Sequence, residues 1–135
     1  VKICLADHAL RASWLQEQVP LAPAALEQAP ALADLAGHVA ESVVGVTLAS
    51  IYGLDVAHLP ASTDQPEIDF VLTIGTRRIP VEVKYQRRID PLRHTEGLRT
   101  FIERSVNNAP FGILVTQTDH PPLADPRIVS LPLSS

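Results

Sequence analysis

The chain has 135 residues, of which 46% are hydrophobic, 19% charged and 4% aromatic, and its formal net charge is −4. This composition fits one folded domain of ordinary size and excludes an intrinsically disordered chain. No apolar run approaches the roughly 18 residues of a membrane span, and the single cysteine, Cys4, cannot form an internal disulfide. We therefore expect a cytoplasmic protein that does not associate with a membrane. Because the chain starts at Val1 and lacks methionine, we expect it to be a piece of a longer polypeptide.

The first part of the chain is expected to be separate from the core. Residues 1–5 predict a short strand and residues 9–19 an amphipathic helix, followed by a linker rich in proline and alanine. We assign residues 1–36 to this N-terminal region and residues 37–135 to a core domain.

The core region predicts an α/β (α+β) domain with the order α-β-β-β-α-β-β. The expected elements are a helix from residue 31 or 37 to residue 52, strands over 54–59, 67–74 and 77–85, a helix over 91–104, and strands over 111–116 and 127–131.

A hairpin in the middle of the chain carries the strongest chemical signal. Gly75-Thr76 suits a two-residue type II′ turn, and that register places Asp69 directly opposite Glu82. Glu67 and Lys84 share their face, and the opposite, core face is expected to hold Ile68, Phe70, Val81 and Val83.

Opposed carboxylates repel each other, so the pair needs a bound cation or a shared proton. A hard divalent ion such as Mg²⁺ fits two such groups. The alternative is an exposed polar face with a cross-strand pair between Lys84 and Glu67. A third acid, Glu41, is the only charged residue from 39 to 51, a stretch that is apolar all round and therefore expected to be buried. Its partner is either His38, one turn earlier, or the Asp69/Glu82 pair; we favour the second.

Basic residues gather around this motif. The segment 77–104 holds 8 of the 11 basic residues and has a net charge of +4, which leaves −8 for the rest of the chain. Such a stripe suits a phosphate backbone, although a solvated surface explains it equally well.

The combined motifs resemble the PD-(D/E)XK nuclease superfamily: a helix with an internal glutamate, then an aspartate, a hairpin and Glu82-Val83-Lys84. More closely, Ile68-Asp69-Phe70-Val71 and Ile79-Pro80-Val81-Glu82-Val83-Lys84-Tyr85 look like the nuclease-like C-terminal domain of prokaryotic AAA-type ATPases, as do residues 2–7 and 37–41. The superfamily's proline directly before the aspartate is missing here, and Pro66 lies three residues upstream. The resemblance implies a restriction-endonuclease-like core, in which helices flank a central mixed sheet. No G-x-x-x-x-G-K-[ST] motif occurs, so the ATPase domain would lie elsewhere in the full-length chain.

The resemblance also implies roles for individual residues. Asp69, Glu82 and Glu41 would hold Mg²⁺ or Mn²⁺, and Lys84 would orient the attacking water. Phosphates of DNA would meet the arginines just beyond the motif: Arg87, Arg88, Arg93 and Arg99. The expected function is a metal-dependent nuclease domain acting on DNA. The alternative is a catalytically silent module of the same fold that binds nucleic acid or a protein partner of the ATPase, and a homo-oligomer is left open.

Overall fold

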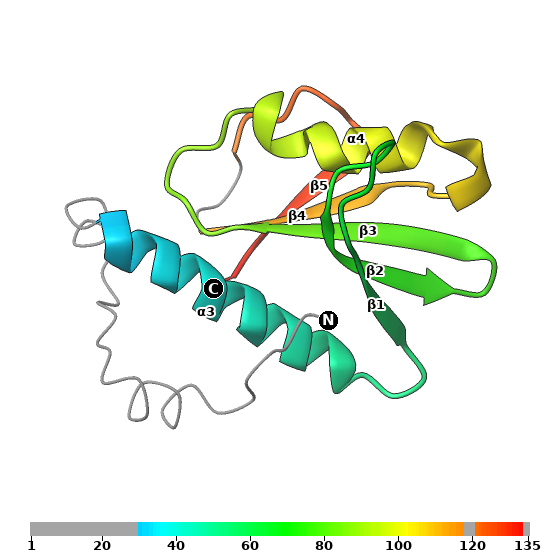
Figure 1. Ribbon diagram of the computed structural model, residues 1–135, viewed down its shortest axis with the longest axis horizontal. Helices are drawn as coiled ribbons and strands as arrows, with labels where there is room; N and C mark the ends of the chain where they lie inside the picture. The colour runs from blue at the N-terminus through cyan, green and yellow to red at the C-terminus, as the bar shows by residue number, and fades with distance from the viewer. Residues whose placement is uncertain (1–29, 118–120, 134–135) are drawn as a thin grey trace.

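The computed structural model describes residues 30–117 and 121–133 (Figure 1). The strand expected over 1–5 and the helix expected over 9–19 lie outside these ranges. The described elements are α3 (Pro30–Ala49), β1 (Asp55–Leu59), β2 (Ile68–Ile74), β3 (Arg77–Lys84), the 3-10 helix η1 (Arg93–Thr95), α4 (Glu96–Glu103), the 3-10 helix η2 (Ser105–Asn107), β4 (Gly112–Thr116) and β5 (Ile128–Pro132). In these ranges, no helix is long and apolar enough to cross a membrane.

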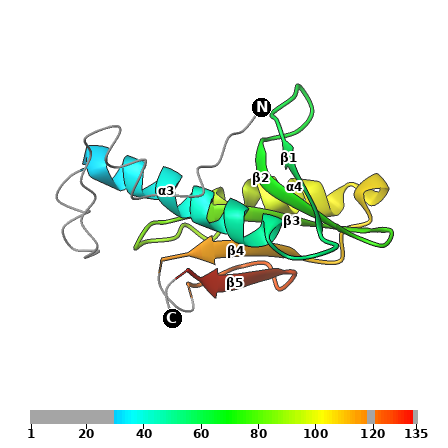
Figure 2. The ribbon, with the colours of Figure 1, turned by 90° about the horizontal axis from the view of Figure 1, so that it is seen from below.

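The five strands form one mixed sheet in the order β1-β2-β3-β4-β5. The β1-β2 and β2-β3 pairs are antiparallel, whereas the β3-β4 and β4-β5 pairs are parallel. Helices α3 and α4 lie on opposite faces of this sheet (Figures 1 and 2). The structure therefore confirms the predicted α/β class, the α-β-β-β-α-β order and the central mixed sheet flanked by helices.

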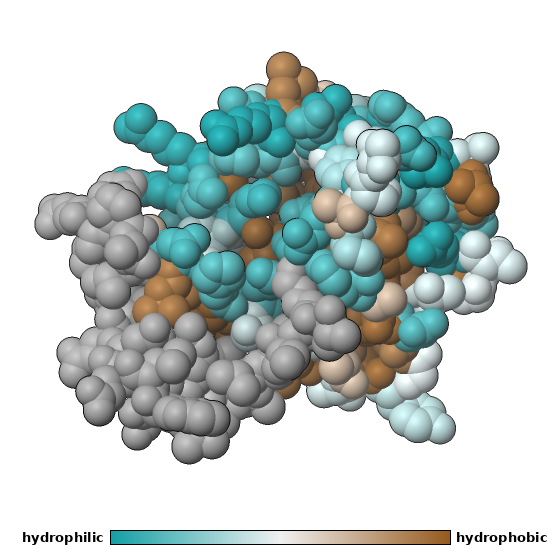
Figure 3. All heavy atoms as spheres, in the orientation of Figure 1, coloured by the Kyte–Doolittle hydropathy of each residue, from teal (hydrophilic) through white to brown (hydrophobic). Residues whose placement is uncertain are grey.

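Each helix completes its own part of the core. Val44 of α3 packs with Phe70 and Val81 on one face of the sheet, and Phe101 of α4 packs with Ile68 and Val71 on the other. In the space-filling view, hydrophilic residues gather over α4, and hydrophobic ones show between them nearer the strands (Figure 3).

The hairpin register is the predicted one where the two strands are paired. The ladder runs from Ile74↔Arg77 to Phe70↔Val81. Gly75 has a φ of +62°, whereas the φ of Thr76 is negative, because Asn108 is the only non-glycine residue with positive φ among the described residues. This is the geometry of a type II′ turn, which requires glycine at its first central position.

The alternation of faces breaks at Asp69. Ile68 and Val71 both pack against Phe101, while Phe70 between them packs on the α3 side. The pairing of β1 with β2 also shifts register between Ala57 and Leu59. The prediction that Ile68 shares a face with Phe70 is therefore wrong, because an irregularity at this position reverses the alternation.

Helix α3 is less buried than its sequence predicts. It buries one stripe, Ala36, Ala40 and Val44, whereas Thr47 and Ala49 are exposed. The prediction of a helix buried all round is wrong, because the sheet covers only one side of it. The helix also ends at Ala49 instead of residue 52 and continues without a break across positions 36 and 37; the domain division there stays a prediction.

The outer edge of β5 offers few hydrogen-bond donors. The Leu133 N–H donates to the Thr116 carbonyl at 2.8 Å, toward β4. Because successive N–H groups of a strand point to opposite sides, those of Ser130 and Pro132 would point outward, and proline has none. The remaining outward donor, Ile128 N–H, bonds to the Asp125 carbonyl at 3.2 Å.

Candidate functional site

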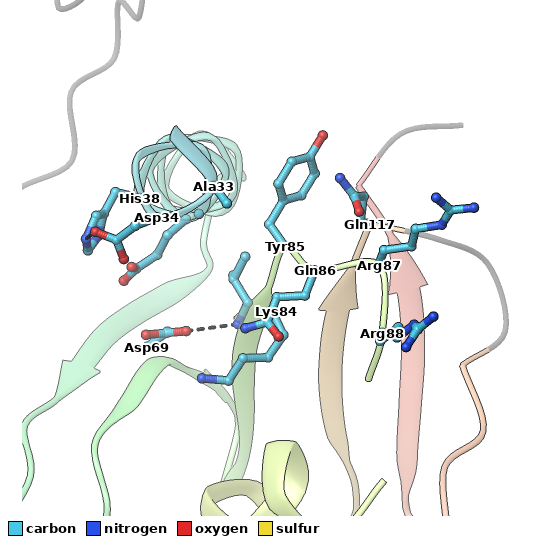
Figure 4. A pocket seen from close by; sticks show the side chains of 13 residues that line it. Ala33, Asp34, His38, Asp69, Lys84, Tyr85, Gln86, Arg87, Arg88 and Gln117 are labelled. Carbon is cyan, nitrogen blue, oxygen red and sulfur yellow. Dashed lines mark hydrogen bonds and ion pairs between the residues drawn. The ribbon is translucent and has the colours of Figure 1, made fainter. Parts of the chain in front are cut away.

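A cavity of about 600 Å³ lies between the first half of α3 and the carboxyl ends of β3 and β4 (Figure 4). Three groups of residues line it: Ala33, Asp34, Gly37, His38 and Glu41 of α3; Asp69 of β2; and Val83, Lys84, Tyr85, Gln86, Arg87, Arg88 and Gln117 from β3, β4 and the residues that follow them. Because β3 and β4 are parallel, their carboxyl ends meet at one edge of the sheet. The cavity thus joins one helix to three strands.

Asp69 is held where the β2–β3 ladder stops. Its Oδ2 accepts the Val83 N–H at 2.9 Å, so the side chain replaces the main-chain acceptor that a continued ladder would supply. The N–H and C=O of one residue in a strand point to the same side, which directs the Val83 carbonyl toward Asp69 as well. A carboxylate and a carbonyl oxygen therefore converge at this end of the hairpin.

Glu82 lies next to Asp69 but is buried on the α4 side of the sheet, with 7% of its surface exposed. Gly97 of α4 leaves room for it, because a Cβ there would lie 3.7 Å from Glu82 Oε1. Burial, followed by the negative charge of Asp69, raises the pKa of Glu82 to about 8, and Lys84 opposes the shift. At neutral pH the Glu82 carboxyl group therefore keeps its proton unless a cation binds beside it.

Lys84 bridges the buried acid and the cavity. Its Nζ lies 3.8 Å from Glu82 Oε2, and its side chain lines the cavity beside Asp69. Glu67, the partner in the alternative interpretation, lies with Oε1 3.7 Å from Nε2 of His58. The predicted Glu-x-Lys tripeptide thus has its acid and its lysine in contact.

Glu41 lines the same cavity as Asp69 and Lys84. His38, its alternative partner, has Nε2 3.6 Å from Oδ2 of Asp34. In the part of the chain that the structure describes, no three His, Cys, Asp or Glu side chains come together as a group able to hold a metal ion. Glu41 therefore faces the site without joining Asp69 and Glu82 in one cluster.

The oxygen donors that remain suit a hard divalent ion. Asp69 and Glu82 supply carboxylates, and strand geometry directs the Val83 carbonyl toward Asp69. Mg²⁺ is commonly held by one or two carboxylates and keeps several waters. The residues present therefore fit Mg²⁺ or Mn²⁺ with water completing the shell.

The four predicted phosphate-binding arginines are divided between two places. Arg87 and Arg88 line the cavity. Arg93 is exposed on η1, and Arg99 donates to Thr95 Oγ1 at 3.2 Å and to the Leu92 carbonyl at 2.8 Å. Arg99 thus ties the first turn of α4 to η1.

Several polar residues of the cavity were not predicted as site residues, among them Tyr85 and Gln117. Lys84 pairs with Thr116 across β3 and β4, which places Tyr85 next to Gln117, and Figure 4 shows Tyr85 between α3 and Gln117. Gln117 is buried with 8% exposed. In the sequence, Gln117 is a polar residue directly after an apolar strand. Once β4 is known to run parallel to β3, this position predicts that Gln117 lies at the same edge of the sheet as Tyr85.

The comparisons with known proteins define a family. The family described as a domain of unknown function, DUF4143, matches residues 36–135. The chain belongs to this family. No curated protein and no solved structure matches the chain.

Proposed function

We propose that this chain is a metal-dependent nuclease domain that hydrolyses phosphodiester bonds of DNA, carried by a larger protein with an ATPase domain. The observation that carries the proposal is the contact between Asp69 and Glu82 beside Lys84. Two carboxyl groups that oppose each other's ionisation favour a divalent cation. The arginines of the cavity and the resemblance of Glu82-Val83-Lys84 to the PD-(D/E)XK motif support phosphate as the substrate group.

Asp69, Glu82 and the Val83 carbonyl would hold Mg²⁺ or Mn²⁺, with Glu41 near enough to the cavity to act through water. A bound divalent ion would supply a water of lowered pKa and would stabilise negative charge on the phosphate. Glu82 would lose its proton on metal binding, because its carboxyl group is largely protonated at neutral pH in the metal-free protein.

The side chains around the ion would act directly on the substrate. Lys84 Nζ would orient the water that attacks phosphorus and would balance the negative charge that develops on the phosphate oxygens. Arg87 and Arg88 would contact neighbouring phosphates and fix the position of the strand, and such contacts carry no sequence information.

A second candidate function is a catalytically silent module of the same fold that binds nucleic acid or a protein partner of the ATPase. One observation favours it: in the described ranges Glu41 does not join the two other acids as a metal-holding group. An active nuclease of this type needs its acids to converge on the ion at some stage of the reaction.

The experiment that separates these candidates is cleavage of labelled plasmid and branched DNA in Mn²⁺. Asp69→Asn and Glu82→Gln are compared with Glu96→Gln, which changes an exposed acid of α4. Cleavage by the parent chain and Glu96→Gln that is lost in both site variants would support the nuclease. No cleavage, or equal cleavage by all four proteins, would overturn it in favour of the silent module.

A further inference from the structure

A second cavity lies at the other end of β3. It measures about 430 Å³ and is bounded by the β2–β3 hairpin on one side and the connection from α4 to β4 on the other. Its lining residues are Arg77, Ile102, Arg104, Ser105, Asn108, Ala109 and Pro110. Arginine is the only charged residue type among them. The cavity is separate from the candidate active site, because β3 runs from Arg77 to Lys84, seven steps of about 3.3 Å or roughly 23 Å in all.

Asn108 fixes the two sides of this cavity to each other. Its backbone has φ +49°, in the left-handed region, and its N–H donates to the Ser105 carbonyl at 3.1 Å. Its side-chain amide donates to the Thr76 carbonyl at 2.8 Å, and its own carbonyl accepts the Arg78 N–H at 3.4 Å. The hairpin turn and the η2 segment are therefore tied together, and the cavity between them is preformed.

Among the described residues, no acid neutralises the charge of either arginine of the cavity. Arg104 donates to Gln65 Oε1 at 3.0 Å, a neutral partner. Arg77 is exposed at the start of β3. Within the described residues, neither one forms an ion pair, whereas Arg127 contacts both Asp125 and Glu103.

Arg78, which follows Arg77 in β3, makes its contacts with residues of the fold. The Arg78 guanidinium lies 5.4 Å from the ring centroid of Phe101 and donates to Asn107 Oδ1 at 3.2 Å. Asn107 is buried and in turn donates to the Phe101 carbonyl at 2.9 Å. Arg78 is thus used within the fold, while Arg77 and Arg104 are left to face a ligand.

We propose that this cavity binds a phosphate monoester, either the terminal phosphate of a nucleic-acid strand or the phosphate of a small molecule. Guanidinium groups match phosphate oxygens with paired N–H donors. A phosphate monoester carries about −1.5 to −2 charges at pH 7, which matches two arginines better than the single charge of a carboxylate or a phosphodiester. Ser105 also lines the cavity, and a serine hydroxyl can donate to a phosphate oxygen. This inference goes beyond the proposed nuclease activity and does not depend on Asp69 or Glu82.

The test measures binding of three probes to the chain in EDTA, so that no divalent ion occupies the candidate active site. The probes are inorganic phosphate and one oligonucleotide in its 5′-phosphate and 5′-hydroxyl forms. We expect the 5′-phosphate form to bind at least tenfold more tightly than the 5′-hydroxyl form. Arg77→Gln and Arg104→Gln should abolish this ratio, and Arg93→Gln, at an exposed arginine of η1, should keep it.

Two further variants separate loss of binding from loss of folding and from loss of the candidate active site. Arg104→Gln loses the bond to Gln65 and could have a lower Tm for that reason alone. Arg104→Lys keeps the positive charge and serves as the second variant. It should bind phosphate more weakly than the parent protein while still preferring the 5′-phosphate oligonucleotide. Asp69→Asn should keep the full ratio, so failure of the nuclease proposal would leave this one standing. Binding of inorganic phosphate with the same arginine dependence, but without discrimination between oligonucleotides, would identify a small-molecule ligand. No binding of phosphate, or binding that Arg93→Gln weakens as much as Arg77→Gln, would overturn the proposal.

Discussion

Replacing Glu82 by glutamine should change how the stability of the protein depends on pH. The pKa of Glu82 rises from an ordinary 4.5 to about 8, so between these values the folded protein holds a proton that the unfolded chain has released. The free energy of unfolding then falls by about 1.4 kcal/mol for each pH unit. The stabilisation is complete below about pH 4.5 and is lost as the pH rises to about 8.

The glutamine side chain imitates the protonated acid and cannot ionise. Glu82→Gln should therefore have about the parent stability at pH 5 and exceed it by several kcal/mol at pH 8. Urea unfolding in EDTA at pH 5, 6, 7 and 8 measures the difference between the two proteins. His94, whose pKa is lowered mainly by burial, contributes to both curves and cancels in that difference.

Two controls locate the effect. Glu96→Gln, at an exposed acid, should run parallel to the parent protein. Asp69→Asn removes the like charge and should make the fall in stability end at a lower pH without abolishing it, because burial is the largest cause of the shift. Parallel curves for the parent and Glu82→Gln across the whole pH range would refute the reasoning.

Three other measurements test the fold and the site. Phe101→Ala should lower the free energy of unfolding by about 3–5 kcal/mol, since Phe101 is fully buried; a loss below 1 kcal/mol in urea would contradict its place in the core. Gly75→Ala should destabilise the protein by roughly 1 kcal/mol because Gly75 has a φ of +62°. Gly37→Ala lies in a helix with nothing within 4 Å of the added Cβ and should stabilise the protein by up to about 1 kcal/mol. Changes of the same sign in the free energy of unfolding of the two variants would contradict this contrast. Millimolar Mn²⁺ at pH 8 should raise the Tm of the parent protein but not of Asp69→Asn, and the same rise in both would place the ion elsewhere.

The hairpin was predictable because its information is local. Gly75 fixes the turn, the turn fixes the register, and the register brings Asp69 near Glu82. The break at Asp69 was not predictable, since it arises when its carboxylate takes the Val83 N–H in place of a main-chain acceptor. The alternation of apolar and polar residues along a strand does not indicate where a side chain will replace a main-chain acceptor.

The environment of the acids depended on elements far away in the sequence. Glu82 is buried because α4 packs over its face of the sheet, with Gly97 next to the carboxylate. Helix α3 looks apolar all round in sequence, yet its described residues bury one side, which includes Ala36, Ala40 and Val44, and expose Thr47 and Ala49. Composition reveals which residues can be buried, whereas the packing of layers decides which of them are.

The outer edge of β5 limits how this domain can associate with other chains. Within the described part of β5, an added strand would find one outward main-chain donor, that of Ser130, because Pro132 has none and the Ile128 N–H is already bonded. Recruitment by sheet extension, and runaway stacking of copies edge to edge, are both disfavoured at this side. A partner that approaches the domain from the β5 side would therefore have to recognise side chains, so that recognition there would depend on sequence instead of on the backbone alone.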